Sequence, residues 1–355
     1  MAVGRKTLMD IYETPRAVDS IYRSIPRIRG LAEEVYGEGP RKFFFIGCGS
    51  SYYAAMYAAL PILNMGGYTA YPQPSSEVLL YTYRAIDSGS VAVAISRSGR
   101  TAETLTALKR AKERGATTII FSITRPGEVP NYIDRYIYID VGGERSVVMT
   151  KSFTSLSLAA WVFSSTVAGL SRGEGVDYGS YVLAVRGAVE ELLDRVDALR
   201  EVSMGLIGSG IGRAVFLGQG PSYPIALEAA LKLKETSYIA TEALHALEFR
   251  HGPMATVGEE QVLVFINPGG GSFNAVRKLY LDMVGRGART ILLTDREGSP
   301  EGGANVVVEI PELGVEDLVA LTAIVPLQLI AYYYAVGRGR DPDAPRNLVR
   351  FVGEY

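Results

Sequence analysis

The sequence is poor in cysteine and histidine, and these shortages exclude several kinds of protein. It contains one cysteine, Cys48, among 355 residues, so an internal disulfide framework and a cysteine-built metal site are both excluded. A single thiol fits an intracellular setting, and we expect a cytoplasmic protein with no metal and no cofactor. The two histidines, His245 and His251, lie close together in the sequence, which makes their neighbourhood a candidate for proton-transfer chemistry.

An excess of either charge sign is also missing. The chain has 36 Lys and Arg residues against 38 Asp and Glu residues, and we find no basic tract, so nucleic acid is excluded as an expected partner. The N-terminus lacks the apolar core of a signal peptide. One stretch, Leu318 to Gly337, reaches membrane length without a charge, but it contains Pro326 and Gln328. We therefore expect a helix buried between protein layers and no membrane partner.

Short apolar runs alternate with helix-forming stretches in the first half of the chain. An apolar run at Phe43 to Ile46 leads through a Gly-Cys-Gly turn into an Ala-rich helix. A second run, Val91 to Ser96, precedes a helix expected from about Ala102 to Arg114, and a third run follows Gly115. This alternation predicts an α/β fold with a parallel sheet that is covered on both faces.

The same order of elements starts again in the second half. Gly47 and Gly49 recur 171 positions later as Gly218 and Gly220, and both pairs are followed by a Ser and a Tyr at matching positions. The later apolar runs align at nearly the same offset. An internal duplication explains this repeat and predicts two doubly wound α/β subdomains.

The repeat and the turn-rich stretches suggest five segments. We expect an N-terminal helical segment interrupted at Pro15 and Pro26, a first subdomain, a helical connector, a second subdomain and a C-terminal tail that closes over the site. The expected boundaries are 1–35, 36–172, 173–205, 206–337 and 338–355.

The segment from Ala226 to Pro253 concentrates the reactive side chains. Its first part has helix-forming composition, which places Glu228, Lys232 and Glu235 at positions i, i+4 and i+7 on one helical face. For an average helix, such a face is a solvated stripe of ion pairs. A further Glu and His251, beside the turn at Gly252-Pro253, favour a functional role here.

The loop from Ser96 to Thr101 is the best candidate for binding a phosphate. Three hydroxyls and a glycine lie between a buried strand and the start of a helix, where free N–H groups and the helix dipole favour an anion. No GK[ST] follows, so a nucleotide P-loop is excluded, and a Tyr replaces the third glycine of a dinucleotide fingerprint in both repeats. The second copy of the loop has lost most of the hydroxyls, which predicts one phosphate site per chain. For the Ser residues of the Gly-x-Gly turns, a capped turn is as good an explanation as ligand contact.

Several motifs in the right order resemble one known family. They are MDIYETP, GCGSS, SRSGRTAETL, the E-x-x-V-x-x-TKSFT stretch, ALEAALKLKETSYI, EFRHGP and DPDAPRNLVRFV. The chain is similar to the tandem sugar isomerase (SIS) domains that form the isomerase part of glucosamine-6-phosphate synthase, also called glutamine–fructose-6-phosphate aminotransferase, and to related archaeal-type glucosamine-6-phosphate deaminases. The resemblance covers almost the whole chain and implies flavodoxin-like subdomains.

The resemblance implies roles for particular residues. Glu235 resembles the base that moves a proton between C1 and C2 of the sugar, Lys232 its neighbour in the pocket, and His251 the ring-opening residue, delivered from the neighbouring subunit of a dimer. A carboxylate and an imidazole have the chemistry for these steps. The residues that resemble the phosphate and sugar ligands or other members of the pocket are Ser51, Ser96, Arg97, Ser98, Thr101, Val147, Glu228 and Arg350.

Departures from the family pattern modify the expected reaction. The sequence shows no N-terminal glutaminase domain and no Cys at position 2, so we expect that it does not release ammonia from glutamine. Arg97 and Arg100 replace a Gln and a Glu of the family's phosphate loop. Arg350 stands where the synthase has a lysine that forms a Schiff base, and a guanidinium is a poor nucleophile.

We therefore expect a homodimeric enzyme that acts on a phosphorylated hexosamine or hexose. The leading hypothesis is reversible release of ammonia from glucosamine 6-phosphate to give fructose 6-phosphate. Three alternatives remain: the isomerase unit of an aminotransferase with a separate glutaminase, a plain aldose–ketose phosphate isomerase, and a non-catalytic sugar-phosphate sensor. Cys48 is expected to be a packed turn residue, because no base is assigned to it.

Overall fold

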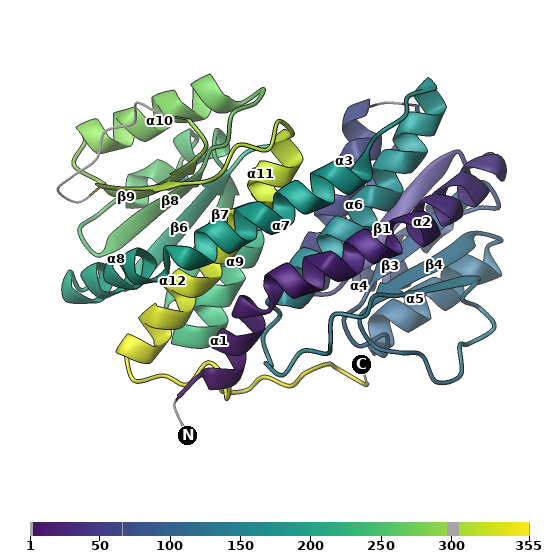
Figure 1. Cartoon of the computed structure of the whole chain (residues 1–355), viewed down its shortest axis with the longest axis horizontal. Helices are drawn as coiled ribbons and strands as arrows, with labels where there is room; N and C mark the ends of the chain where they lie inside the picture. Colours follow the sequence, from purple (N-terminus) through teal and green to yellow (C-terminus); the bar gives the residue numbers. More distant parts are fainter. Residues whose placement is uncertain (1–2, 66, 297–304, 355) are drawn as a thin grey trace. The chain divides into compact units, whose positions relative to one another are not determined.

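The computed structural model describes residues 3–65, 67–296 and 305–354, and these form two compact units (Figure 1). One unit consists of Met1–Pro15, Arg145–Thr150 and Ala184–Leu348. The other consists of Arg16–Glu144, Lys151–Leu183 and Val349–Tyr355. We call the first the C-terminal unit, because it contains the second sheet of the chain, and the other the N-terminal unit, because it contains the first sheet. The short segment Arg145–Thr150 therefore packs with the C-terminal unit, although the chain on either side of it belongs to the N-terminal unit.

The N-terminal unit is built on a five-stranded parallel sheet. Its strands are β1 (Lys42–Gly47), β2 (Thr69–Pro74), β3 (Ser90–Ile95), β4 (Thr117–Ser122) and β5 (Arg135–Tyr138). They lie in the order β2-β1-β3-β4-β5, with every described pairing parallel. This is the doubly wound, flavodoxin-like order, so the predicted fold class is confirmed.

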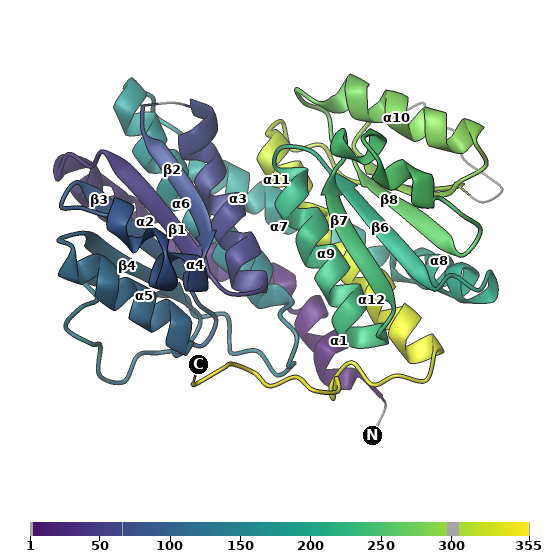
Figure 2. The same ribbon diagram turned by 180° about the vertical axis from the view of Figure 1, so that it is seen from behind.

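Helices cover both faces of this sheet, and the strand residues explain why. Helices α4 (Ser75–Leu80) and α5 (Ala102–Glu113) share a core with Phe44 and Ile46 of β1 (Figure 2). Phe43 and Phe45 alternate with these two and are also completely buried. The opposite face carries α3 (Ser50–Met65) and α6 (Lys151–Arg172), which pack against each other. A strand buried on both sides needs the continuous apolar run that predicted it.

The C-terminal unit repeats this architecture. Its strands are β6 (Arg213–Gly218), β7 (Ala240–His245), β8 (Gln261–Ile266), β9 (Arg289–Thr294) and β10 (Asn305–Glu309). The order β10-β9-β8-β6-β7 is that of the first sheet read from the other edge, and the pairings are again parallel. Because the order and direction of the strands match, the internal duplication is confirmed.

Helix α10 (Phe273–Gly285) covers one face of the second sheet, and α8, α9 and α12 cover the other (Figure 1). Helix α9 spans Ser222–Ser237, and α8 spans Val196–Gly208 after α7 (Tyr178–Asp194). The predicted apolar stretch near the C-terminus forms α11 (Glu316–Thr322) and α12 (Ile324–Gly337). Two short 3-10 helices, η2 (Glu248–Arg250) and η3 (Pro253–Thr256), follow β7.

The N-terminal helices correct one prediction. The expected interruption near Pro15 exists, because α1 (Arg5–Tyr12) ends and α2 (Thr14–Gly37) begins there. Pro26, however, lies inside α2, so the second predicted interruption is wrong. An interior proline costs a helix about 3 kcal/mol. Three isoleucines around it, Ile21, Ile25 and Ile28, are at most 9% exposed, and burying each contributes about 1.5–3 kcal/mol, which outweighs that cost.

Both Gly-x-Gly turns need their glycines for the same two reasons. A Cβ on Gly47 would lie 2.4 Å from the backbone oxygen of Ser51, and a Cβ on Gly218 would lie 2.3 Å from that of Ser222. The second glycine of each turn has a positive φ, 54° at Gly49 and 55° at Gly220. Each strand can therefore turn directly into its helix only because both positions lack a side chain.

Among the described residues, two helical stretches are long and apolar enough to cross a membrane by length and composition. They are Lys151–Arg172 and Glu316–Gly337, and their apolar windows are 94% and 89% buried. Sequence reasoning named one stretch of membrane length, Leu318 to Gly337, and so missed Lys151–Arg172. The prediction that Leu318 to Gly337 is buried in the protein core is confirmed. Helix α6 is buried to a similar degree, so it is also explained as a core helix.

Candidate functional site

Helix α9 brings three charged side chains together, as the helical spacing predicted. The Lys232 Nζ atom lies 2.6 Å from Glu235 Oε2 and 3.3 Å from Glu228 Oε1. The side chains of Lys232 and Glu228 are 2% and 0% exposed, whereas that of Glu235 is 18% exposed. This is therefore not a solvated stripe of ion pairs. Of the three, Glu235 has the most exposed side chain, so it is the best placed to meet a ligand.

Electrostatics keeps Lys232 charged in this setting. Complete burial by itself lowers the pKa of an ammonium group, but the negative charges of Glu228 and Glu235 outweigh that effect and raise the pKa of Lys232 above its ordinary value. Lys232 is therefore a fixed positive charge at neutral pH. It can orient the Glu235 carboxylate, and it is not available as a neutral amine.

The segment Arg145–Thr150, which contains Val147, packs close to this lysine. The backbone N–H groups of Arg145 and Ser146 donate to the Asp10 carboxylate at 2.6 and 2.7 Å. A cavity of about 10 Å³, large enough for about one water molecule, lies beside Lys232. Its other lining residues include Thr7, Val148, Thr150, Thr236 and Gln328. The buried side of Lys232 therefore has no room for a sugar, and Val147 is held only a residue away from this cavity wall.

The two histidines have different surroundings. The ring of His245, at the end of β7, stacks on Tyr223 with 3.6 Å between centroids. Burial lowers the pKa of His245, and the charge of Glu248 opposes this only partly. His251 follows η2 and is exposed, with its backbone N–H donating to the Glu248 carbonyl. In the part of the chain that the structure describes, no hydrogen bond or ion pair joins His251 to the charged face of α9.

The loop Ser96–Thr101 lies where the sequence predicted it, between β3 and the start of α5. The hydroxyl of Ser96, a residue that is 2% exposed, accepts the Gly99 N–H at 3.1 Å, and the Ser98 hydroxyl accepts the Arg100 N–H at the same distance. These neutral hydroxyls are the partners that an incoming anion can replace. A cavity of about 320 Å³ adjoins the loop. Its lining residues are Arg97, Ser98, Arg100, Ile123, Thr124, Gly143, Glu144, Arg350 and Phe351.

Arg97 is held by its own chain. Its guanidinium lies 3.2 Å from Glu144 Oε2 and donates to the Arg350 carbonyl at 2.5 Å. The Glu144 carboxylate also accepts the Ser152 backbone N–H at 3.1 Å and the Ser152 hydroxyl at 2.6 Å. The Arg350 guanidinium in turn donates to the Glu144 backbone carbonyl. These bonds fasten the C-terminal tail to the loop, and the tail also accepts the Ala102 N–H, at the start of α5, through the Val352 carbonyl.

Ser51 and Cys48 belong to the Gly-x-Gly turn of the same unit. Ser51 lies in the first turn of α3 and is 7% exposed. Burial raises the pKa of the Cys48 thiol, and hydrogen bonds to Thr104 and Ser75 oppose that rise only in part. A thiol that is harder to ionise is a poor nucleophile, which supports a packing role for Cys48.

The second copy of the phosphate loop is already occupied by carboxylates of its own chain. The Gly269 N–H donates to Asp295 at 2.6 Å, and the Gly271 N–H donates to Glu316 at 3.2 Å. A Cβ on Gly270 would lie 2.0 Å from the Glu316 carboxylate, so this glycine makes room for it. An incoming phosphate would meet two negative charges here. This arrangement supports the prediction of a single phosphate site, in the N-terminal unit.

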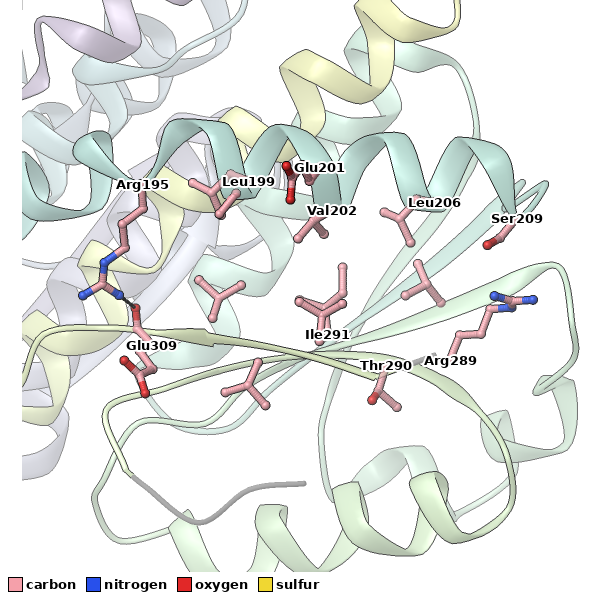
Figure 3. Close-up of a pocket in the computed structure, with 16 residues that line it drawn as sticks. Arg195, Leu199, Glu201, Val202, Leu206, Ser209, Arg289, Thr290, Ile291 and Glu309 are labelled. Atoms are coloured by element: carbon pink, nitrogen blue, oxygen red, sulfur yellow. Dashed lines mark hydrogen bonds between the residues drawn. The ribbon is translucent and has the colours of Figure 1, made fainter. Parts of the chain in front are cut away.

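A larger cavity lies elsewhere, in the C-terminal unit (Figure 3). It has a volume of about 540 Å³ and lies between α8 and strands β8, β9 and β10. Its walls are mainly apolar, with Leu199, Val202 and Leu206 facing Ile291, and Arg195 at one end is engaged with the Glu309 carbonyl at 3.0 Å. It contains none of the residues singled out for chemistry, so size alone does not make it the reactive site.

Sequence reasoning missed several residues of the 320 Å³ cavity. Glu144 belonged to a recognised motif but was given no role, and Arg100 was noted only as a departure from the family pattern. Phe351 also belonged to a recognised motif without being given a role, and Thr124, which follows β4, lies in no motif; both reach the loop through tertiary packing. Among the described residues, no group of three or more His, Cys, Asp or Glu side chains could hold a metal ion.

Comparison with known proteins identifies the family to which the sequence and the fold are similar. The family model described as SIS domain matches residues 39–165 and 209–338. A glutamine–fructose-6-phosphate aminotransferase (isomerizing) from Thermococcus kodakarensis is 35% identical over 350 residues, which cover 97% of this chain and 57% of that protein. The chain thus spans little more than half the length of the curated relatives it matches.

Two solved structures are also similar. The C-terminal domain of glucosamine-fructose-6-phosphate aminotransferase from Francisella tularensis has a TM-score of 0.83 and 29% identity, with 95% of this chain and 97% of that chain covered. Glucosamine-6-phosphate deaminase from Thermotoga maritima has a TM-score of 0.74 and 25% identity, with 98% and 99% covered.

Proposed function

The chain belongs to the SIS domain family, and on that premise we propose that it is an isomerising deaminase of glucosamine 6-phosphate. The products are fructose 6-phosphate and ammonia, and the reaction is reversible. Within this proposal, the Ser96–Thr101 loop and Ser51 bind the phosphate and sugar hydroxyls, and Glu235 transfers the proton. The observation that carries the proposal is the geometry of α9, where Lys232 holds the Glu235 carboxylate at 2.6 Å while leaving it partly exposed.

The proposed chemistry uses one base twice. His251 moves the proton from the C1 hydroxyl to the ring oxygen, which opens the ring to the aldehyde. Glu235 takes the proton from C2 and returns it to C1, while a second proton passes from the C2 amine nitrogen to the C1 oxygen. The carbonyl of C1 thereby becomes a hydroxyl, and the C2 amine becomes an imine. One water molecule hydrolyses this imine to the ketone, and ammonia leaves. The fixed charge of Lys232, 2.6 Å away, holds the Glu235 carboxylate in one orientation for the first transfer.

Two observations favour a deaminase over an enzyme that binds its substrate covalently. Arg350, which stands at the position of the family's Schiff-base lysine, has its guanidinium bonded to the Glu144 backbone carbonyl. A guanidinium stays protonated and does not add to a carbonyl. The similarity to the deaminase from Thermotoga maritima extends over almost the whole of both chains.

The decisive assay measures ammonia and fructose 6-phosphate released from glucosamine 6-phosphate. Glu235→Gln removes the base without changing the size of the side chain, and loss of a general base typically costs 10²–10⁴-fold in kcat. Glu242→Gln makes the same substitution on an exposed residue of β7 and serves as the matched control. If Glu235→Gln releases ammonia as fast as the control, Glu235 is not the base.

The second candidate is the isomerase unit of a glutamine-dependent aminotransferase, and the 35% identity to the protein from Thermococcus kodakarensis favours it. That activity would form glucosamine 6-phosphate from fructose 6-phosphate only with a glutaminase partner supplying ammonia. Turnover of glucose 6-phosphate without ammonia would instead indicate an aldose–ketose isomerase. Binding of the sugar phosphates with turnover of none would indicate a sensor.

We also propose a homodimer in which His251 comes from the neighbouring subunit. The support is that His251 is exposed and that, among the described residues, no hydrogen bond or ion pair joins it to α9 of its own chain. Mixing the inactive variants Glu235→Gln and His251→Asn under exchange conditions would then restore activity, because a mixed dimer contains one intact site. Activity that stays at the level of the separate variants would place the histidine within its own chain.

A further inference from the structure

The cavity beside the Ser96–Thr101 loop carries more positive than negative side chains. Three arginines, Arg97, Arg100 and Arg350, line it together with one carboxylate, Glu144. Because guanidinium groups stay protonated at all physiological pH values, the lining has an excess of two positive charges. This excess belongs to side chains, so it adds to the attraction that the N–H groups of the loop exert on any anion.

The ion pair between Arg97 and Glu144 accounts for one charge of each sign. Their side chains are 10% and 0% exposed and 3.2 Å apart. The Glu144 carboxylate also accepts the Ser152 hydroxyl, and a second guanidinium nitrogen of Arg97 donates to the Arg350 carbonyl. Arg97 is therefore a positioning residue that holds the tail, although its place in the sequence suggested a phosphate ligand.

The two remaining positive charges are Arg100 and Arg350, and both residues are exposed. Arg350 donates to a backbone carbonyl, which is neutral and leaves its charge uncompensated. Arg100 makes no side-chain hydrogen bond or ion pair within the described part of the chain. Burial raises the pKa of Tyr136, and the charge of Arg100 opposes that rise. The Tyr136 hydroxyl donates to the Thr124 carbonyl at 2.9 Å, so Arg100 acts on the same wall of the cavity.

We infer that Arg100, together with Arg350, makes this cavity selective for a dianionic ester. A phosphomonoester carries two negative charges above its second pKa of about 6, which match the two uncompensated guanidinium groups. A sulfate ester has a similar shape but one charge, and it leaves one guanidinium without a counter-charge. This inference rests on the proposed function, because it assumes that the phosphate of the sugar enters at this loop.

The test compares the binding of sorbitol 6-phosphate and sorbitol 6-sulfate by titration calorimetry on the full chain at constant ionic strength. Neither probe has a carbonyl or amine at the reacting carbons, so both bind without turnover. At pH 8 we expect the phosphate ester to bind at least about tenfold more tightly than the sulfate ester, since charge-assisted bonds are the stronger ones. The preference should fall as the pH drops through about 6, where the phosphate becomes a monoanion.

Arg100→Gln should weaken binding of the phosphate ester about tenfold and binding of the sulfate ester much less, so that the preference collapses. Arg100→Lys keeps the charge and should keep most of the preference. Lys109→Gln removes one positive charge from an exposed position of α5, the helix that follows the loop, and it controls for a general charge effect. Because Arg100 has no described side-chain partner to lose, the variant should fold like this control.

The outcomes separate this inference from the proposed function. If Arg100→Gln keeps the same preference for the phosphate ester as Lys109→Gln, the assignment of Arg100 is wrong, while the phosphate site stands. If the unaltered chain binds neither ester, the phosphate site itself is wrong and both proposals fall. If the selective binding is found but no ammonia is released from glucosamine 6-phosphate, the selectivity is supported and only the proposed reaction is refuted.

Discussion

Replacing Lys232 with methionine tests the electrostatic core of the candidate site. The substitution keeps a long apolar stem but removes the cation that lies 3.3 Å from Glu228, which is 0% exposed, and 2.6 Å from Glu235. Removing one partner of a buried ion pair costs about 3–5 kcal/mol, because the remaining charge stays buried without compensation. A domain has only about 5–15 kcal/mol of unfolding free energy, so this loss is a large fraction of the total.

The assay is urea unfolding followed by circular dichroism. With a slope of about 2–3 kcal/mol per molar urea, Lys232→Met should lower the unfolding midpoint by roughly 1–2 M. Lys234→Met alters an exposed lysine of the same helix and should change the unfolding free energy by no more than about 0.5 kcal/mol. The double variant Glu228→Gln, Lys232→Met also removes the buried negative charge, so it should regain most of the lost stability.

The pH dependence gives an independent check. Because the pKa of Lys232 is raised in the folded chain, its stabilising contribution is complete below the unfolded value of about 10.4 and is lost as the pH rises through the folded pKa. The unaltered chain should therefore lose stability at alkaline pH, and Lys232→Met should lack this part of the loss. The reasoning is refuted if Lys232→Met unfolds at the same urea concentration as Lys234→Met, or if the double variant is no more stable than Lys232→Met.

Two further predictions concern the phosphate loop and the tail. Gly99→Ala should lower the unfolding free energy by about 1–3 kcal/mol, because φ of Gly99 is +63° and the new Cβ would lie 2.4 Å from the Tyr136 hydroxyl. The control is Gly30→Ala, which lies within α2 and whose new Cβ would meet nothing within 4 Å. In thermal unfolding, this control should be neutral or stabilising. Glu144→Gln leaves the buried Arg97 without its carboxylate, so we expect a loss of about 3 kcal/mol and faster proteolytic removal of the C-terminal tail, and equal proteolysis of variant and unaltered chain would contradict the fastening role.

The fold could be predicted because its signals are local. Apolar runs such as Phe43 to Ile46 predict buried parallel strands by themselves, and the repeat of the Gly-x-Gly turns predicts the second subdomain. The grouping of Glu228, Lys232 and Glu235 was also predictable, since the helical period alone places positions i, i+4 and i+7 on one face.

The surroundings of these groups could not be predicted in the same way. The family resemblance implied a phosphate ligand at Arg97, but it could not show that the guanidinium contacts Glu144 and the Arg350 carbonyl of the tail. Pro26 looked like a helix boundary, but burial of the isoleucines beside it keeps the helix continuous. The partners of Arg97 are far from it in sequence, and the continuity of the helix at Pro26 depends on how much apolar area is buried. Neither can be seen in a local sequence pattern.

The amino-acid sequence by itself determined the order of strands and helices, the duplication and the face of α9 that carries the reactive charges, because each depends on residues within a turn or two of one another. Only the tertiary structure decided which of these charges are buried, which arginines are already paired, and which copy of the loop is filled by its own carboxylates. Those outcomes depend on solvent exclusion and on distances between segments far apart in the chain, and both arise only when the units fold.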